Sequence, residues 1–143
     1  MSLLSKDVEL SLQAAIREAE VRRHEFVTVE HLLFALLHHE SAATIITGCG
    51  GEISLLTQSI EHYFSEMLEP VPDEAPYELE LTSSLQRVID NVLTHAQSAE
   101  KQTADAGDVV AALLLEDRSY AAHFLRQQGI ERLNVLEFIS HHQ

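Results

Sequence analysis

Histidine and carboxylate side chains give this 143-residue sequence its widest choice of chemistry, with nine histidines and 23 acidic residues. The adjacent pairs His38-His39, Glu61-His62 and His141-His142 could supply imidazole and carboxylate ligands to a metal ion. Neighbouring residues on a helix point in different directions, so a tetrahedral site would need ligands from several elements. We therefore interpret the histidines as surface residues and predict no metal site, with a bound metal as the alternative.

The sequence also lacks the common signatures of catalysis. It has no G-x-x-x-x-G-K-[ST], G-x-G-x-x-G, G-x-S-x-G or H-E-x-x-H pattern. His24-Glu25 and His39-Glu40 begin the last pattern but have no second histidine at the required position. A carboxylate–histidine pair such as Glu61-His62 could act in acid–base chemistry, although spacing alone selects no reaction. The chain is thus predicted not to be an enzyme.

The charge balance restricts the class of partner. Nine basic residues against 23 acidic ones give a formal net charge of −14. Nucleic acids and anionic membranes attract basic surfaces, so neither is predicted as a partner, whereas a basic protein would be attracted.

The apolar runs at residues 32–37 and 109–115 are too short to span a bilayer. Cys49 is the only cysteine in the sequence, so it has no second cysteine with which to form a disulfide. With no basic and apolar leader at the start, the chain is predicted to be cytoplasmic.

Hydrophobic spacing predicts helices along almost the whole chain, and no segment alternates with period two for long enough to indicate a strand. The fold class is therefore all-α, with eight helices. The predicted helices of the first half cover residues 3–23, residues 29–38 behind an N-cap at Thr28, a short helix from an N-cap at Ser41 to Gly48, and a helix from residue 53 to residue 64. Those of the second half begin at Thr82 or Ser83, Asp105, Ser119 and Leu133.

The two halves also resemble each other. All three prolines lie in the acidic segment 68–80, which cannot continue a helix. Residues 12–16 match residues 85–89 at an offset of 73, residues 32–37 match 109–114 at 77, and Ser41 and Gly51 match Ser119 and Gly129 at 78. The offset between matching residues thus increases along the chain, and we interpret this drift as a longer first helix in the second copy. This predicts one domain over residues 1–143, with repeat one at about 3–66, a linker at 68–81 and repeat two at about 82–141, related by a pseudo-twofold axis.

A known family shares these features. The segment 23–37 combines a Thr28 N-cap with a helix that is apolar on nearly every face from Leu32 onward, as in a buried central helix. Its H-E-F-V-T-V-E-H-L-L-F-A-L-L run, the two repeats, the Leu85-Gln86-Arg87-Val88 helix and the closing Phe138-Ile139-Ser140-His141 span essentially the whole chain. On these residues the sequence resembles the N-terminal Clp repeat domains of the Clp AAA+ protein unfoldases, above all those of the ClpA type.

The resemblance implies a role as well as a fold of two four-helix repeats. In this family the domain is tethered to two ATPase modules, which form a hexamer docked on the ClpP peptidase and hold the ATP and magnesium. The domain itself is expected to carry no cofactor and to be monomeric when isolated. It is expected to bind the adaptor ClpS and to help recruit unfolded or tagged substrates. A freestanding all-helical protein that binds a metal or another ligand is the alternative.

The same resemblance supplies candidate site residues. The family's adaptor surface includes the acidic residues of the motif, here Glu25 and Glu30, and the start of the first helix of repeat two, here Thr82 and Gln86. We expect exposed carboxylates at Glu25 and Glu30 to pair with lysines of the adaptor, each pair contributing about 1 kcal/mol or less. The alternative role for both glutamates is favourable charge at the start of a helix.

Overall fold

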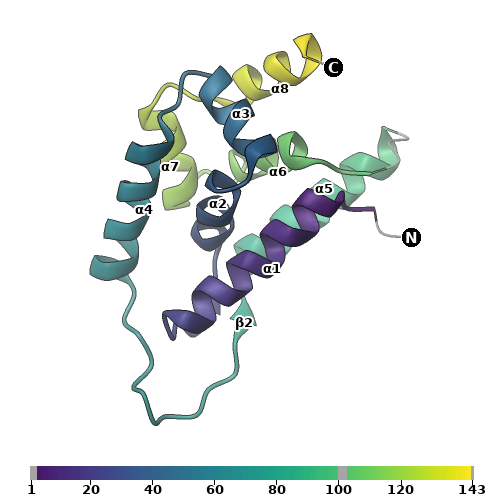
Figure 1. The fold of residues 1–143 in the computed structure, drawn as a ribbon. Helices are drawn as coiled ribbons and strands as arrows, with labels where there is room; N and C mark the ends of the chain where they lie inside the picture. Colours follow the sequence, from purple (N-terminus) through teal and green to yellow (C-terminus); the bar gives the residue numbers. More distant parts are fainter. Residues whose placement is uncertain (1–2, 100–102, 143) are drawn as a thin grey trace.

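Eight α-helices make up the fold in residues 3–99 and 103–142, the parts of the chain that the computed structural model describes. The all-α prediction is confirmed, with one pair of two-residue strands, β1 (Phe26–Val27) and β2 (Glu80–Leu81), in addition. Figure 1 shows the helices wrapped around a central α2, and the long segment that joins α4 to β2. The helices are α1 (Lys6–Val21), α2 (Val29–Leu37), α3 (Glu40–Gly48), α4 (Ile53–Met67), α5 (Ser83–Ser98), α6 (Ala106–Leu113), α7 (Tyr120–Gln127) and α8 (Arg132–His141).

Four of the eight helices begin at the polar N-cap that the sequence predicted. The side chains of Thr28, Thr82, Asp105 and Ser119 each accept a hydrogen bond from the backbone N–H three residues further on, at 3.0 to 3.2 Å. The prediction for α3 was wrong. This helix begins at Glu40, so Ser41 lies inside it.

The first two helices of each half repeat at one spacing, which corrects the drift predicted between them. Helices α1 and α5 both have 16 residues, and their N-caps Ser5 and Thr82 lie 77 residues apart, as do Thr28 and Asp105. The offset of 73 for the first helix was wrong by one helical turn, because a shift of four residues keeps the apolar face in phase. The buried positions agree at the offset of 77: Val8, Ser11, Ala15 and Ala19 in α1 match Leu85, Val88, Val92 and Ala96 in α5.

Short parallel pairings join the two halves crosswise. Strand β1, which precedes α2, pairs with β2, which precedes α5, in the register Phe26↔Glu80. The equivalent residues of the other two helices form a single parallel bridge, Leu4↔Ala104, before α1 and α6. The two halves are thus related by a pseudo-twofold axis, and each pairing joins a segment of one half to a segment of the other. Sequence periodicity missed these pairings because two residues are too few to show alternation.

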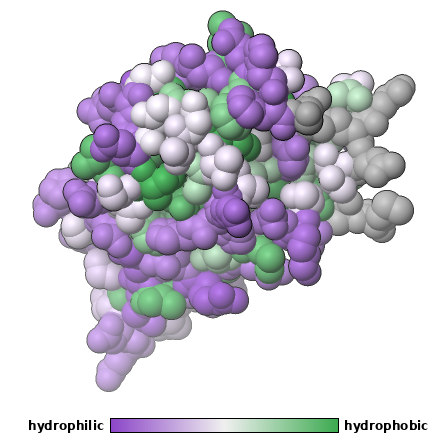
Figure 2. Space-filling model, turned by 45° about the horizontal axis from the view of Figure 1, so that its top comes forward, coloured by the Kyte–Doolittle hydropathy of each residue, from purple (hydrophilic) through white to green (hydrophobic). Residues whose placement is uncertain are grey.

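The core is built around two helices that are buried on every side. All nine residues of α2 and all eight of α6 are buried, as predicted for the central helix. Helix α2 packs against α1, α3, α4, α6 and α7, so it holds both repeats together. Outside the core, Figure 2 shows a largely hydrophilic face interrupted by small apolar patches. No helix in residues 3–99 and 103–142 is both long and apolar enough to cross a membrane.

Arg23 holds the proline-rich segment against the domain. This residue follows α1 and has a left-handed backbone, with φ of 56°. Its guanidinium donates hydrogen bonds to the carbonyls of Val71, Pro72 and Ala75 at 3.0, 2.7 and 2.9 Å, and it lies 5.2 Å from the centre of the Tyr77 ring. Residues 68–79 are non-helical, in agreement with the three prolines. The exact limits of the repeats and of the linker stay a prediction.

Removing the Arg23 side chain should loosen this segment. We expect Arg23→Ala to increase the rate of cleavage by a glutamate-specific protease after Glu69, Glu74 and Glu78 at least fivefold, because three hydrogen bonds to the loop backbone are lost. Limited proteolysis followed by mass spectrometry measures the rate. Arg17→Ala, which removes an exposed guanidinium from α1, is the control. Equal cleavage of the two variants would show that Arg23 does not restrain the loop.

Candidate partner-binding groove

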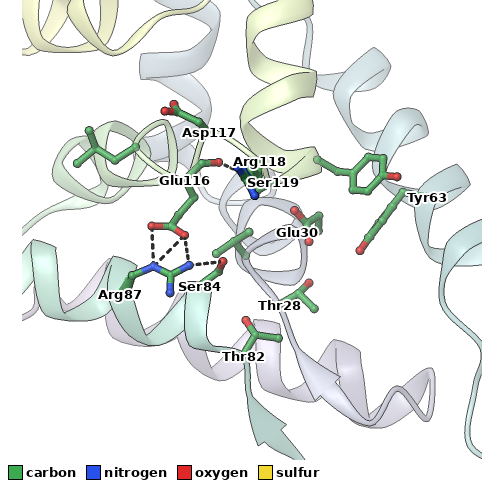
Figure 3. A pocket seen from close by; sticks show the side chains of 13 residues that line it. Thr28, Glu30, Tyr63, Thr82, Ser84, Arg87, Glu116, Asp117, Arg118 and Ser119 are labelled. Carbon is green, nitrogen blue, oxygen red and sulfur yellow. Dashed lines mark hydrogen bonds and ion pairs between the residues drawn. The ribbon is translucent and has the colours of Figure 1, made fainter.

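A groove of about 520 Å³ lies where the N-terminal ends of α2, α5 and α7 meet (Figure 3). Its wall is rich in hydroxyl groups, which both donate and accept hydrogen bonds. The side chains come from both repeats, so the groove exists only once the two halves have packed together. The residues that line it are Thr28, Val29, Glu30, Tyr63, Thr82, Ser84, Arg87, Leu115, Glu116, Asp117, Arg118, Ser119 and Tyr120.

Glu30 is a structural part of this groove. Only 4% of its surface is exposed, and its Oε2 accepts a hydrogen bond of 2.9 Å from the backbone N–H of Ala121 in the first turn of α7. A carboxylate at this position also interacts favourably with the helix dipole. The expected exposed carboxylate at Glu30 was therefore wrong, because the first turn of α2 is covered by α7. Burial, together with the nearby Glu30 charge, raises the pKa of Tyr63 to about 12.

An ion pair closes one side of the groove. The Arg87 guanidinium donates to both carboxylate oxygens of Glu116, with a shortest N–O distance of 2.8 Å, and to the Ser84 hydroxyl at 3.0 Å (Figure 3). The hydrogen bonds from Arg87 lower the pKa of the Glu116 carboxyl. Asp117 is paired with Arg126 at 2.8 Å. Two of the groove's carboxylates are thus neutralised within the chain.

The four predicted site residues do not all meet. Glu30 and Thr82 line the groove, whereas Glu25 and Gln86 are exposed and lie outside it. The Glu25 carbonyl accepts from the Glu80 N–H at 3.2 Å beside the β1–β2 pair, and the Gln86 N–H donates to the Thr82 carbonyl at 3.0 Å in the first turn of α5.

Sequence reasoning missed several groove residues, including Tyr63, Arg87, Glu116 and Tyr120. These side chains come from α4, α5, α7 and the segment before α7. No motif or spacing links them in the sequence, so only the packing of the helices reveals them.

A buried histidine pair is joined by hydrogen bonds to Thr28, one of the groove residues. The backbone N–H of Thr28 donates to His31 Nδ1 at 3.0 Å, so in the neutral ring the proton is assigned to Nε2, which lies 2.9 Å from His24 Nδ1. The His31 ring stacks on Phe64, with centroids 4.6 Å apart. Burial, followed by the charges of His24 and Arg22, lowers the pKa of His31 to about 3, and burial also lowers that of His24.

The other histidines do not gather into a ligand set. Within residues 3–99 and 103–142, no group of three or more His, Cys, Asp or Glu side chains has an arrangement that could hold a metal ion. His38, His141 and His142 instead place Nδ1 2.7 to 2.8 Å from a backbone carbonyl of their own helix or its last turn. Cys49 is half-buried, and burial raises the pKa of its thiol.

Comparison with known proteins agrees with this architecture. Residues 3–128 match the family model of the Clp repeat N-terminal domain. A ClpA homolog protein of Fuscovulum blasticum is 32% identical over 138 residues, which cover 96% of this chain but 17% of that protein. Among solved structures, the Hsp104 N-terminal domain of Candida albicans superposes with a TM-score of 0.77 at 12% identity, over 92% of this chain and 85% of that one. A ClpV N-domain in complex with a VipB peptide gives a TM-score of 0.73 at 21% identity, over 93% and 82%.

The family model covers well over half of the sequence, and the structural relatives share the fold of this chain. The chain therefore belongs to the Clp repeat N-terminal domain family. One sequence relative is a ClpA homologue, of which this chain spans about a sixth.

The buried histidines predict a loss of stability in mild acid. The unfolded chain binds a proton at His31 near pH 6.5, whereas the folded chain does so only near pH 3, so stability is fully present above pH 6.5 and decreases below it. We expect His31 alone to lower the free energy of unfolding by about 1.4 kcal/mol between pH 7.5 and 5.5. Urea denaturation at both pH values measures this change, with His31→Asn as the test variant and exposed His123→Asn as the control. An equal pH dependence in wild type and His31→Asn would contradict the assignment.

Proposed function

We propose that this chain is the N-terminal docking domain of a ClpA-type AAA+ unfoldase, which binds the adaptor ClpS and recruits substrates for degradation. The domain itself performs no catalysis. ATP hydrolysis, with its magnesium, belongs to ATPase modules elsewhere in the full-length protein. The ClpP peptidase cleaves the unfolded substrate in the cytoplasm. The sequence relationship to a ClpA homologue supports this assignment. The observation that carries it is the groove at the junction of the repeats.

The groove suits a segment of protein. Hydroxyls from Thr28, Thr82, Ser84 and Ser119 can hydrogen-bond the amides of an extended partner chain, whose backbone offers both donors and acceptors. The volume of about 520 Å³ accommodates several side chains. A structurally similar ClpV N-domain forms a complex with a peptide of VipB, which supports peptide binding as a property to test in this chain.

Charge would direct the adaptor to one edge of this groove. Glu25 is exposed beside the β1–β2 pair, the half-buried Thr82 caps α5, and the exposed Gln86 lies in the first turn of that helix. We propose that Glu25, Thr82 and Gln86 contact ClpS directly and that Glu30 positions the start of α7 behind them. With a net charge of −14, the domain attracts a basic adaptor surface and increases its rate of encounter.

The first test is a calorimetric titration with ClpS at two salt concentrations. We expect one-to-one binding that weakens as salt increases, and a further loss of about fivefold with Glu25→Lys, because the exposed carboxylate would become a repulsive charge. Glu137→Lys, on α8 and outside the groove, makes the same charge change as a control. If ClpS binds Glu25→Lys and Glu137→Lys equally well, the proposed contact surface is wrong. If it does not bind the wild-type chain, the adaptor assignment is wrong.

Glu30 should respond differently from Glu25. Glu30→Gln keeps an oxygen that can accept from the Ala121 N–H, whereas Glu30→Lys places a cation against the N-terminus of α7. We expect Glu30→Lys to lower the free energy of unfolding by about 3 kcal/mol and Glu30→Gln by about 1 kcal/mol or less. Thermal and urea unfolding, followed by circular dichroism, measure both. Equal stability of Glu30→Lys and wild type would contradict the buried position of this side chain.

A further inference from the structure

A second, more apolar groove lies directly beside the first. It has a volume of about 460 Å³ and runs between α4 and α7. Tyr63, Met67, Tyr120 and Phe124 provide its apolar surface, and Glu66 and His123 lie at its edge. Met67 is 57% exposed and Tyr120 41% exposed, although both are large apolar side chains. Apolar surface gathered in a concave site is typical of a place where another molecule binds.

Two tyrosines form the boundary between the grooves. Tyr63 and Tyr120 line both of them, and their rings pack with centroids 4.6 Å apart. The interaction of the Tyr63 hydroxyl with Glu30 directs the polar end of this side chain into the first groove. Its ring meanwhile contributes to the apolar side. A ligand that fills the first groove therefore reaches the second by crossing a single pair of aromatic rings.

The electrostatics select the charge of this ligand. Arg22 pairs with Glu18, Arg87 with Glu116, and Arg126 with Asp117. Arg23 is engaged by the loop carbonyls. These four guanidiniums are thus occupied within the chain, whereas Arg118 is an exposed cation in the wall of the first groove. Glu66 is an exposed carboxylate that lines the second groove, and the chain carries a net charge of −14. A segment with lysine or arginine next to its apolar residues complements both features.

We infer that the groove between α4 and α7 binds an apolar side chain of a basic, extended partner segment whose backbone continues through the first groove. This inference rests on the proposed function, because it extends the same docking surface. The occupant is a segment of a partner protein with one or two large apolar residues next to lysine or arginine. The apolar residue fills the space beside Met67 and Phe124, and a flanking cation lies near Glu66.

Fluorescence anisotropy with a defined peptide tests the inference. The probe is a fluorescein-labelled ten-residue peptide with adjacent leucine and phenylalanine between pairs of lysines. Two comparison peptides replace the apolar pair by serine or the lysines by glutamate. We expect the probe to bind the 143-residue chain at least tenfold more tightly than either comparison peptide. Equal binding of the serine peptide, or no binding of the probe, would overturn the inference.

Matched variants on one helix assign the binding site. Met67→Ser removes an exposed apolar side chain from the groove, and Leu55→Ser removes a 46% exposed one from the same helix outside it. We expect Met67→Ser to weaken probe binding about fivefold and Leu55→Ser to change it less than twofold, since only Met67 would be buried by the peptide. Unfolding temperatures of both variants control for stability. The same affinity in Met67→Ser as in Leu55→Ser would overturn the inference.

Two further measurements distinguish this inference from the proposed adaptor function on which it rests and from self-association of the chain. Suppose that ClpS binds, that Glu25→Lys weakens ClpS binding, and that Met67→Ser leaves the affinity for the probe unchanged. The inference about the second groove is then wrong and the proposed adaptor surface is supported. If Met67→Ser weakens binding of the probe but ClpS does not bind, the inference about the second groove is supported and the adaptor assignment is wrong. Sedimentation of the free chain gives the third outcome. A dimer that Met67→Ser dissociates would make a second copy the occupant and overturn the inference.

Discussion

The complete burial of α2 is the constraint on which the rest of the structure depends. A helix whose nine residues are all buried must satisfy the backbone groups of its first turn without water. Thr28 and His31 do this by exchanging hydrogen bonds, and His24 in turn lies against His31. Glu30 then becomes a partner for the start of α7. Two of the polar groups at the start of this apolar helix, Thr28 and Glu30, thus also line the groove.

The two repeats solve the same problem with different residues. Helix α6 is buried as completely as α2, and Asp105 and Asp108 form its capping box where Thr28 and His31 form that of α2. The chain segments before these helices pair crosswise with those before α1 and α5. Equivalent backbone positions can therefore carry different side chains. The groove residues Thr28, Glu30 and Thr82 correspond at the offset of 77 to Asp105, Gly107 and Ser5, so the pseudo-twofold axis does not repeat the groups of the groove.

Much of this fold can be predicted from the sequence, because helix periodicity and N-caps are local signals. Thr28, Thr82, Asp105 and Ser119 were predicted correctly, whereas Ser41 and the offset of the first helix were not. Both errors arise because neighbouring helical turns look alike in sequence. The candidate site is harder to predict. Burial of Glu30 depends on α7, which is 91 residues away in the chain, and Tyr63 meets Tyr120 only after α4 and α7 have packed.

The packed tyrosine pair also gives the domain an optical property. The sequence has no tryptophan and three tyrosines, so these three rings dominate the ultraviolet emission of the chain. Tyr63 and Tyr120 stand between the two grooves, and Tyr77 lies against Arg23 on the proline-rich segment. Two of the three emitters thus belong to the candidate site itself. The unlabelled domain carries its own spectroscopic reporter where a partner would displace water from those rings.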